Sequence, residues 1–540
     1  MDVRSWGRQL KQVWRTGIFA PGLTLGWCLA ILFFAGLRLL GQRPGWHVDL
    51  VVLIGGLMIL SAWQLTHLAL TLIGRRPAGW QSWQLLWRHK GTWILVELGL
   101  TILALPLGLG GLSSRLLVRV PLPAGFINYV GLHRRPVGIV VAIIYLLVAS
   151  GCLLRGPWVF RRLAPQIQHP GTWRQMATAL LVSAGLLAVW WGLAEGLVAL
   201  NWWGDAHLSP GPAKLLAAGS LLLIFLGFVV AVILAAITLV WSWCGQPTVS
   251  RPVPRHQGWW LMGVLVVAGA CVSGQALLSP PQFAPMVAIS HRGVDHGVGV
   301  QNTLGALRHV SRQHPAYVEM DLHETRDHQW VVLHDENLAV LARRNVTPHQ
   351  LTLAQLEQLT VHENGYHDRL VGWATYLKVA ERLRQPLLVE IKTTPQDSPN
   401  AIHQFARQYG TRLRRDGSAV HSLDYRVVTQ LKQVVPQLRV GYITPFNWVS
   451  PAAVPADFYS FQRISLSQQF ILAAHQAGAP AWVWTPDSRA AMSRMWALGA
   501  DGEITNELSR LQSVMRQSPS ENWWAVVQNF IHSYLSITAE

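Results

Sequence analysis

Seven long apolar runs in residues 1–285 constrain the first half of the chain more than any other feature. Each run is close to the ~20 residues that a helix needs to cross the hydrocarbon core of a bilayer. We therefore predict an N-terminal all-α polytopic membrane domain over residues 1–280, with about seven transmembrane helices. The runs lie near residues 19–41, 49–73, 92–112, 136–154, 176–200, 214–243 and 259–278.

The positive charge of the chain is confined to the same half. Residues 1–285 hold 21 Lys and Arg against five Asp and Glu, which gives +16 of the formal net charge of +17. Because these charges flank apolar runs and form no basic face, no nucleic-acid partner is expected. With the N-terminus inside, the inside segments carry 14 Lys and Arg and the outside loops carry six, so the positive-inside rule favours this orientation. Seven spans then place everything after residue 280 on the outer, extracytoplasmic face.

Residues 281–510 change to short β-rich runs that alternate with helical periodicity. This alternation over about 250 residues predicts a parallel sheet, and the length suits an α/β domain of the (β/α)8 TIM-barrel type. Nine candidate strands compete for eight barrel positions. One of the three weaker candidates, near Ala419, Phe458 and Glu503, is therefore expected to be wrong. All four cysteines precede residue 281, so this half contains no disulfide and no thiol-based site.

Residues 511–540 form a C-terminal tail with an amphipathic pattern. Apolar side chains recur on one helical face over residues 522–535, which predicts a helix. Two surfaces could receive this face, the barrel and the membrane surface, and we favour packing on the barrel.

Charged residues and histidines end four successive strand candidates of the second half. Side chains two residues apart on a strand point to the same side, so Glu319 projects with Asp321 and Glu390 projects with Lys392. In a barrel, the carboxyl ends of the strands converge on one mouth, where the active site lies. The group expected there is His291, Arg292, Glu319, Asp321, His334, Glu390 and Lys392.

The residue types in this group indicate metal-assisted cleavage of a phosphate ester. Three clustered carboxylates repel one another unless a cation relieves them, and a site of oxygen ligands suits Mg²⁺ or Ca²⁺. Arg292 and Lys392 complement an anionic substrate. Two histidines that titrate near neutral pH can act as general base and general acid.

The order of these motifs resembles that of the glycerophosphodiester phosphodiesterase family, a TIM-barrel family with the pattern HRG, P-E-N-T, E-x-D, HD and E-x-K. The resemblance covers residues 286–510, and the multi-span first half is similar in architecture to bacterial membrane-anchored members. The matching residues are His291-Arg292-Gly293, Gln301-Asn302-Thr303, Glu319-Met320-Asp321, His334-Asp335, Glu390-Ile391-Lys392, Trp482-Val483-Trp484-Thr485 and 499–506.

The resemblance implies a role for each matching side chain. His291 and His334 would be the acid/base pair, and Arg292 and Lys392 would stabilise charge on the phosphate. Substrate would be bound by Arg292, Lys392, Trp484 and Asn302, and the divalent metal by Glu319, Asp321 and Glu390. Two departures stand out: Gln301 replaces the family glutamate, which we expect to tune the site, and residues 336–344 lack the D-R-T-T run that borders the substrate.

The resemblance further implies a multi-pass protein of the bacterial cell membrane that hydrolyses glycerophosphodiesters to glycerol 3-phosphate and an alcohol. With the barrel outside, its substrates would be deacylated phospholipid headgroups or glycerol-phosphate polymers, and the lipid bilayer would be its other partner. The attacking group is either water or a neighbouring substrate hydroxyl, which would give a cyclic phosphate first. The alternative functions are a phospholipase D-like lyase that acts on lysolipids, a non-catalytic phosphodiester-binding membrane protein, and a transporter.

Overall fold

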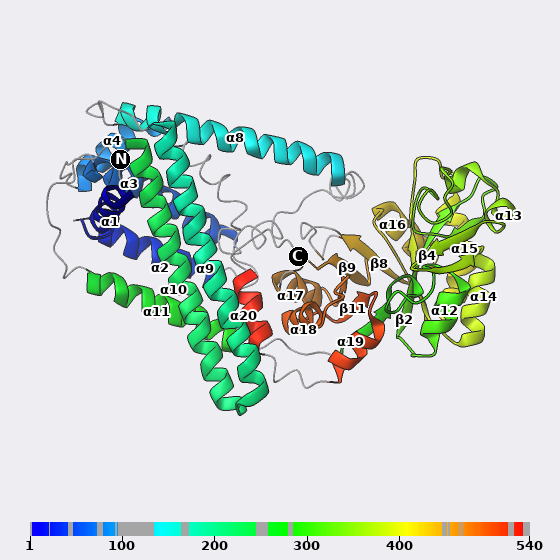
Figure 1. Cartoon of the computed structure of the whole chain (residues 1–540). Coiled ribbons are helices and arrows are strands. Elements are labelled where there is room, and N and C mark those ends of the chain that lie inside the picture. The colour runs from blue at the N-terminus through cyan, green and yellow to red at the C-terminus, as the bar shows by residue number, and fades with distance from the viewer. Residues whose placement is uncertain are drawn as a thin grey trace. The chain divides into compact units, whose positions relative to one another are not determined.

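The computed structural model divides the chain into two compact units (Figure 1). One unit holds most of helices α1 to α11 and the end of α20 from Val526, and the other holds the strands and helices from β1 to α19. The residues that the structure describes are 3–20, 22–40, 47–72, 79–91, 94, 134–163, 172–244, 258–278, 285–444, 451, 454–463, 466, 468–516 and 523–532.

Most of the described helices of the helical unit lie at the positions of the predicted runs. The helices are α1 (Val3–Phe19), α2 (Leu23–Leu40), α3 (His47–Leu72), α4 (Gly79–Arg88), α8 (Arg134–Leu163), α9 (Trp173–His207), α10 (Pro210–Cys244) and α11 (Gly258–Leu278). Of these, only α1 and α4 lie outside the predicted runs. Among the described residues, three segments are long and apolar enough to cross a membrane: Trp173–His207, Pro210–Cys244 and Trp259–Leu277. The bent pair Gly7–Phe19 and Leu23–Leu39 adds a fourth if it forms one span.

The remaining predicted runs are not resolved into full spans. The runs at 49–73 and 136–154 fall on α3 and α8, whose apolar parts Met58–Leu72 and Pro136–Gly151 are shorter. The run at 92–112 lies outside the described residues except for residue 94. The total of seven spans therefore stays a prediction.

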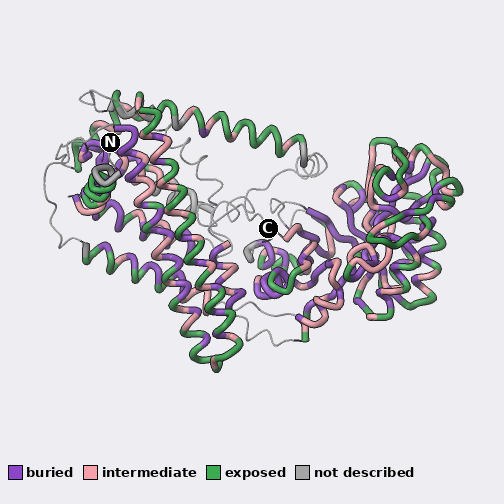
Figure 2. Tube along the Cα trace, viewed as in Figure 1, coloured by how far each residue is buried: buried purple, intermediate pink, exposed green. Residues whose placement is uncertain are grey.

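Buried hydrogen bonds join α9 to α10 within an apolar surrounding. The indole N–H of Trp190 donates to the carbonyl of Ile224 over 3.0 Å, and Asn201 Nδ2 donates to Ser220 Oγ over 2.7 Å. An unpaired polar group in such surroundings costs several kcal/mol, so these bonds fix the relative position of the two helices. By contrast, α8 exposes a run of large apolar side chains, and Figure 2 shows it exposed along most of its length.

The second unit is a closed barrel of eight parallel strands. Its strands are β1 (Val287–Ser290), β2 (Tyr317–Glu324), β6 (Leu387–Ile391), β7 (Ala419–Ser422), β8 (Arg439–Thr444), β9 (Phe458–Gln462), β10 (Ala481–Trp484) and β11 (Gly502–Thr505). They pair in the order β1-β11-β10-β9-β8-β7-β6-β2, and pairing of β1 with β2 closes the barrel. The predicted TIM barrel is confirmed.

One strand assignment made from the sequence is wrong. All three weaker candidates, near Ala419, Phe458 and Glu503, are barrel strands. The candidate outside the barrel is β3 (Trp330–Val332), which pairs antiparallel with the end of β2. The connection between Glu324 and Trp330 is too short for the crossover that a parallel pair requires, so the chain turns back as a hairpin.

Helices around the barrel bury one apolar face each. They are α12 (Leu304–Ser311), α13 (Leu353–Leu356), α14 (Trp373–Leu383), α15 (Ala401–Arg415), α16 (Tyr425–Val434), α17 (Gln468–Gln476), α18 (Arg489–Leu498) and α19 (Leu508–Met515). In α14 the buried positions are Trp373, Tyr376, Leu377 and Ala380, a helical spacing that packs against the sheet. A smaller cluster fills the barrel interior, with Ile289, Leu388, Phe458, Trp482 and Ile504.

The tail forms the predicted helix, α20 (Trp523–His532). Its residues from Val526 cluster with the helical unit, and its first three residues cluster with the barrel unit. Arg38 of α2 lies over the ring of Phe530, with its guanidinium carbon 5.3 Å from the ring centre. The rings of Trp191 in α9 and His532 are 5.8 Å apart. The end of the tail thus finds cation–π and edge-on aromatic partners on the helical unit, and packing of the tail on the barrel stays a prediction.

Glu503 of β11 is a fully buried carboxyl on the helix-facing side of the barrel. Its register partners are Ala288 and Val483, and neither of its carboxyl oxygens has a hydrogen-bond partner among the described residues. Burial raises the pKa of Glu503 well above its ordinary value. The carboxyl is therefore protonated in the folded protein under conditions where the unfolded chain has already lost the proton.

We predict that Glu503→Gln makes the stability of the protein less dependent on pH. Because the folded state keeps a proton that the unfolded state releases above about pH 4.3, wild-type stability falls as the pH rises through this range. The melting temperature of the variant should exceed that of wild type by a margin that grows from about pH 4.5 to about pH 8. Thermal unfolding of the full-length protein in detergent measures this margin. The exposed Glu336→Gln is the control, and parallel pH profiles for wild type and Glu503→Gln would contradict the prediction.

Candidate active site

The site lies at the carboxyl ends of β2, β6 and β7. Asp321 of β2 is in register with Glu390 of β6, and Glu390 is in register with His421 of β7. Register partners on adjacent strands point to the same side of the sheet, so these three side chains form a row inside the barrel. Glu319 lies two residues before Asp321 on β2 and joins the row from one layer below.

Within this row the structure groups two of the three predicted metal ligands with a histidine. Ligand atoms of Glu319, Glu390 and His421 all lie within 4.8 Å of one another. Glu319 and His421 are buried. Sequence reasoning missed His421, because its place beside Glu390 depends on the strand register and is marked by no sequence motif.

Asp321 is occupied by cationic and amide partners. Its Oδ1 lies 3.2 Å from Lys392 Nζ, its Oδ2 lies 3.8 Å from Arg292 Nε, and Asn302 Nδ2 donates to Oδ2 over 2.9 Å. Burial alone would raise the pKa of Asp321, but the positive charges of Lys392 and the other basic groups outweigh it and hold that pKa well below its usual range. Asp321 is therefore a carboxylate that holds the basic side chains of the site in place.

Glu319 has the opposite electrostatic environment. Burial, and then the neighbouring carboxyls of Asp321 and Glu390, raise the pKa of Glu319 well above its ordinary value. One hydrogen bond opposes this effect: the backbone N–H of Arg292 donates to Glu319 Oε2 over 2.8 Å. Glu319 is thus short of positive charge, and a proton or a metal ion would supply it.

Lys392 is the basic partner of this acidic group. Its Nζ donates to Glu390 Oε1 over 2.8 Å and also faces Asp321. Burial would lower the pKa of Lys392, but the carboxylates of Glu390 and Asp321 outweigh burial and raise it. The ammonium therefore keeps its charge inside the barrel.

Arg292 is positioned through a chain of hydrogen bonds that the sequence did not predict. Its Nη1 donates to Gln301 Oε1 over 2.7 Å. Gln301 Nε2 donates to Glu363 Oε1 over 2.6 Å, and the Gln301 backbone N–H donates to Glu363 Oε2 over 2.8 Å. Glu363 thus brings a carboxylate next to the position where the family pattern has one, with Gln301 between it and Arg292.

Glu363 lies on a hairpin that was not predicted. Strands β4 (Thr360–Glu363) and β5 (Tyr366–Arg369) are joined by Asn364 and Gly365, both with positive φ. An Asn-Gly pair between two extended runs is a strong hairpin signal, so the sequence contained this information.

The two predicted catalytic histidines each have a polar partner on Nδ1. His291 Nδ1 lies 2.7 Å from Asn506 Oδ1, and its Nε2 lies 4.0 Å from Glu319 Oε2. Burial and then the nearby Arg292 lower the pKa of His291 to about 4, so its imidazole is neutral near pH 7. A neutral imidazole with Nδ1–H bound to an amide oxygen presents Nε2 as a proton acceptor.

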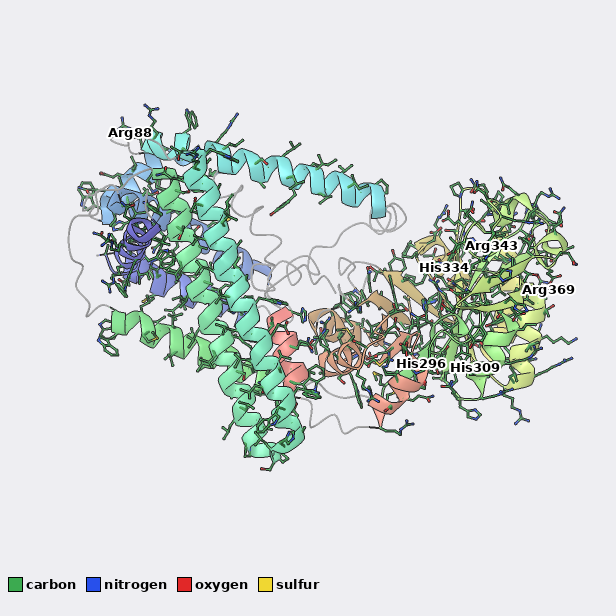
Figure 3. The ribbon with its side chains drawn as sticks, in the orientation of Figure 1. Arg88, His296, His309, His334, Arg343 and Arg369 are labelled. Atoms are coloured by element: carbon green, nitrogen blue, oxygen red, sulfur yellow. The ribbon has the colours of Figure 1, made fainter. Side chains whose placement is uncertain are left out.

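His334 reaches the site by way of the antiparallel strand β3. The backbone N–H of Leu333 donates to the carbonyl of Asp321, which places the residues after β3 beside the end of β2. His334 Nδ1 lies 2.7 Å from Asp335 Oδ1, and Nε2 of the buried His323 lies 3.1 Å from the His334 carbonyl. Figure 3 labels His334 among the side chains of the barrel unit. Its ring is half-exposed and is bound to a carboxylate next to the barrel mouth.

Trp484 ends β10 and packs against the aromatic and aliphatic side chains of the barrel interior. Its side chain is neither fully buried nor fully exposed. All the side chains predicted for the site therefore belong to the carboxyl ends of barrel strands or to segments held next to those ends.

Comparison with known proteins assigns the family. Residues 291–510 match the model of the glycerophosphoryl diester phosphodiesterase family. A putative glycerophosphodiester phosphodiesterase of Bacillus subtilis (strain 168) is 23% identical over 234 residues, which are 41% of this chain and 94% of that protein. A glycerophosphodiester phosphodiesterase of Caldanaerobacter subterraneus subsp. tengcongensis is 22% identical over 240 residues, which are 43% of this chain and 98% of that protein.

Among solved structures, a putative glycerophosphoryl diester phosphodiesterase from Silicibacter pomeroyi DSS-3 is similar, with a TM-score of 0.39 and a sequence identity of 19%. The similarity covers 44% of this chain and 95% of the chain of that structure. The barrel unit is a TIM-barrel enzyme domain with an acidic and basic site at its mouth. Over residues 291–510 it matches the model of the glycerophosphoryl diester phosphodiesterase family.

We predict that Gln301→Glu impairs the enzyme and that adding Glu363→Gln restores it. The single change places two carboxylates within hydrogen-bond distance, and their repulsion moves Arg292. The expected loss in kcat/KM is about tenfold, equivalent to about 1.4 kcal/mol. In the double variant the carboxylate and the amide have only exchanged places, so we expect kcat/KM within about threefold of wild type.

Steady-state kinetics on wild type, both single variants and the double variant measure this coupling. Additive losses in the double variant would show that Gln301 and Glu363 do not act together.

Proposed function

We propose that the protein is a metal-dependent phosphodiesterase that hydrolyses glycerophosphodiesters to glycerol 3-phosphate and an alcohol. The observation that carries this proposal is the group of three carboxylates at the barrel mouth, two of them buried, with Arg292 and Lys392 beside it, in a domain that matches this family. The carboxylates attract a cation, and the two basic side chains attract an anionic substrate, so the site suits a phosphate ester bound next to a metal ion.

The charge balance of the site fits a divalent cation. Glu319 and Glu390 lie close together, and a proton must otherwise compensate Glu319. We propose that Glu319 and Glu390 hold the cation, with Asp321 as the third predicted ligand. When bound, the cation would polarise the phosphoryl oxygens and balance the negative charge that develops there.

The two histidines divide the proton transfers. We assign the general base to His291, whose neutral ring turns Nε2 away from its Asn506 partner and towards the carboxylate group. We assign the general acid to His334, because the Asp335 carboxylate holds its ring through Nδ1 and leaves Nε2 for the substrate. His291 would accept the proton of the attacking hydroxyl, and His334 would donate a proton to the oxygen of the leaving alcohol.

The basic side chains orient the substrate. Arg292 has a guanidinium fork that suits phosphate oxygens, and Gln301 fixes one of its nitrogens. Lys392 faces the same carboxylates and would neutralise a further phosphoryl oxygen. Asn302 bonds to Asp321 and Trp484 lines the barrel interior, so we assign them to the edge of the glycerophosphate site.

We predict that the purified full-length protein in detergent releases glycerol 3-phosphate from glycerophosphocholine with Mg²⁺, Ca²⁺ or Mn²⁺, and that EDTA stops the release. His334→Ala should lower the rate by ~10²–10⁴-fold, as expected for the loss of a general acid. An enzymatic assay for glycerol 3-phosphate measures both effects.

Matched controls make this test specific. The partly exposed His309→Ala on α12 should leave the rate unchanged. Release that continues in EDTA would exclude metal dependence, and a loss below tenfold for His334→Ala would remove His334 from the acid/base pair. No release with any metal, from protein shown to be folded, would exclude this substrate class.

We further propose that the helical unit anchors the protein in a bacterial cell membrane, with the barrel on the extracytoplasmic face. Three apolar helices among the described residues have the length of a span, and α8 exposes large apolar side chains. The excess of Lys and Arg in alternate loops supports an inside N-terminus.

We predict that protease added to intact cells, or to spheroplasts where an outer membrane is present, cuts the barrel. Immunoblotting against the barrel measures the loss of the full-length chain. A known external protein serves as the positive control and a cytoplasmic protein as the negative control. Full protection of the barrel while the external protein is cut would place the barrel on the inner face.

A further inference from the structure

His421 is a buried histidine at the proposed metal site, and the family resemblance gives it no role. It lies beside Glu390 in the register of β6 and β7, and its side chain is buried. Its ligand nitrogen lies within 4.8 Å of carboxylate oxygens of both Glu319 and Glu390. Its Nε2 has no hydrogen-bond partner among the described residues.

Residues from the neighbouring strands fix the orientation of this ring. His421 Nδ1 lies 3.1 Å from Ser460 Oγ of β9, and the ring centre lies 6.2 Å from that of Phe458. Gly441 of β8 is the register partner of His421, and a Cβ there would meet the ring of Phe458. The missing side chain at Gly441 therefore makes room for Phe458, which packs beside the imidazole.

The hydrogen bond to Ser460 determines which nitrogen faces the carboxylates. With Nδ1–H donating to Ser460, Nε2 carries the lone pair. A histidine that binds a metal typically donates its other ring N–H to a fixed partner, which is the arrangement seen here. If Nε2 instead carried the proton, a hydrogen bond to Glu319 or Glu390 would be expected, and none is formed. An imidazole lone pair beside two carboxylates repels them unless a cation lies between the three groups.

We propose that His421 is a ligand, through Nε2, of the metal ion held by Glu319 and Glu390, and that it makes the site selective for a first-row transition metal such as Mn²⁺ over Ca²⁺. This inference rests on the proposed metal-dependent function. Ca²⁺ takes six to eight oxygen ligands, whereas imidazole suits transition metals and carboxylates suit Mn²⁺ as well. A mixed site of one imidazole nitrogen and the carboxylates of Glu319 and Glu390, with Asp321 as the third predicted carboxylate, therefore favours Mn²⁺, Fe²⁺, Co²⁺ or Zn²⁺.

The test is the binding of Mn²⁺ alone to the full-length protein, stripped of metal and kept in detergent. Electron paramagnetic resonance measures bound Mn²⁺, and electron spin echo modulation detects a directly coordinated imidazole nitrogen. We expect about one bound Mn²⁺ with nitrogen modulation in wild type. His421→Gln should abolish the modulation and weaken Mn²⁺ binding at least ~10-fold, and it should reduce the preference for Mn²⁺ over Ca²⁺ measured by competition.

His291→Gln is the matched control, because His291 Nε2 also faces Glu319, at 4.0 Å. It should keep the nitrogen modulation. Should His421→Gln fail to fold, as judged by circular dichroism, wild type and the double variant His291→Gln/His334→Gln still decide the question. Modulation retained in the folded double variant supports His421 as the source of the nitrogen, and modulation lost in it overturns the proposal.

The possible failures separate this inference from the proposed function. Bound Mn²⁺ without nitrogen modulation, together with EDTA-sensitive release of glycerol 3-phosphate, overturns the role of His421 and leaves the phosphodiesterase function intact. Modulation that is unchanged in folded His421→Gln has the same meaning. No binding of Mn²⁺, Mg²⁺ or Ca²⁺ to the folded protein overturns both.

Discussion

The active-site end of the barrel depends on the close approach of three carboxylates on two adjacent strands. Barrel closure places the buried Glu319 and Asp321 next to the partly buried Glu390. Like charges at this separation cannot all persist without compensation, and buried charges are not tolerated unless they are paired. Lys392 and Arg292 compensate Asp321, while Glu319 keeps a demand for positive charge. The need to compensate these charges therefore gives the carboxylates different roles: Asp321 holds the basic side chains, and Glu319 requires a proton or a metal ion.

Polar side chains farther from the carboxylates also help to compensate the charges of the site. Asn302 bonds to Asp321 through both the nitrogen and the oxygen of its side-chain amide, and Gln301 connects Arg292 to Glu363. Arg292 is thereby held between the buried carboxylate of Asp321 and its outer partner Gln301. An active site whose charges are fixed before substrate arrives has less reorganisation to undergo during the reaction.

The sequence predicts the site residues whose arrangement follows from their spacing along one strand. It does not predict those whose arrangement depends on how the strands pair. The E-x-D and E-x-K pairs were correctly placed on one side of their strands, because alternation along a strand is a local property. The run at 329–333 was assigned to the barrel because a short, fully apolar run does not distinguish a parallel from an antiparallel strand. The brief connection before it was the signal that excluded a parallel crossover. His421 could not be recognised, since only the register of β6 and β7 brings it beside Glu390.

The end of α20 belongs to the helical unit, although the chain reaches it only after completing the barrel. The barrel is therefore an insertion between two segments of the helical unit, and is linked to it at both of its own ends. Such a two-ended linkage restricts the motion of the barrel more than a single flexible connection would. Cleavage of either connection alone would leave the barrel attached through the other. Separation of the barrel from the helical unit would require two cleavages, or one cleavage and the release of the end of α20 from α2 and α9.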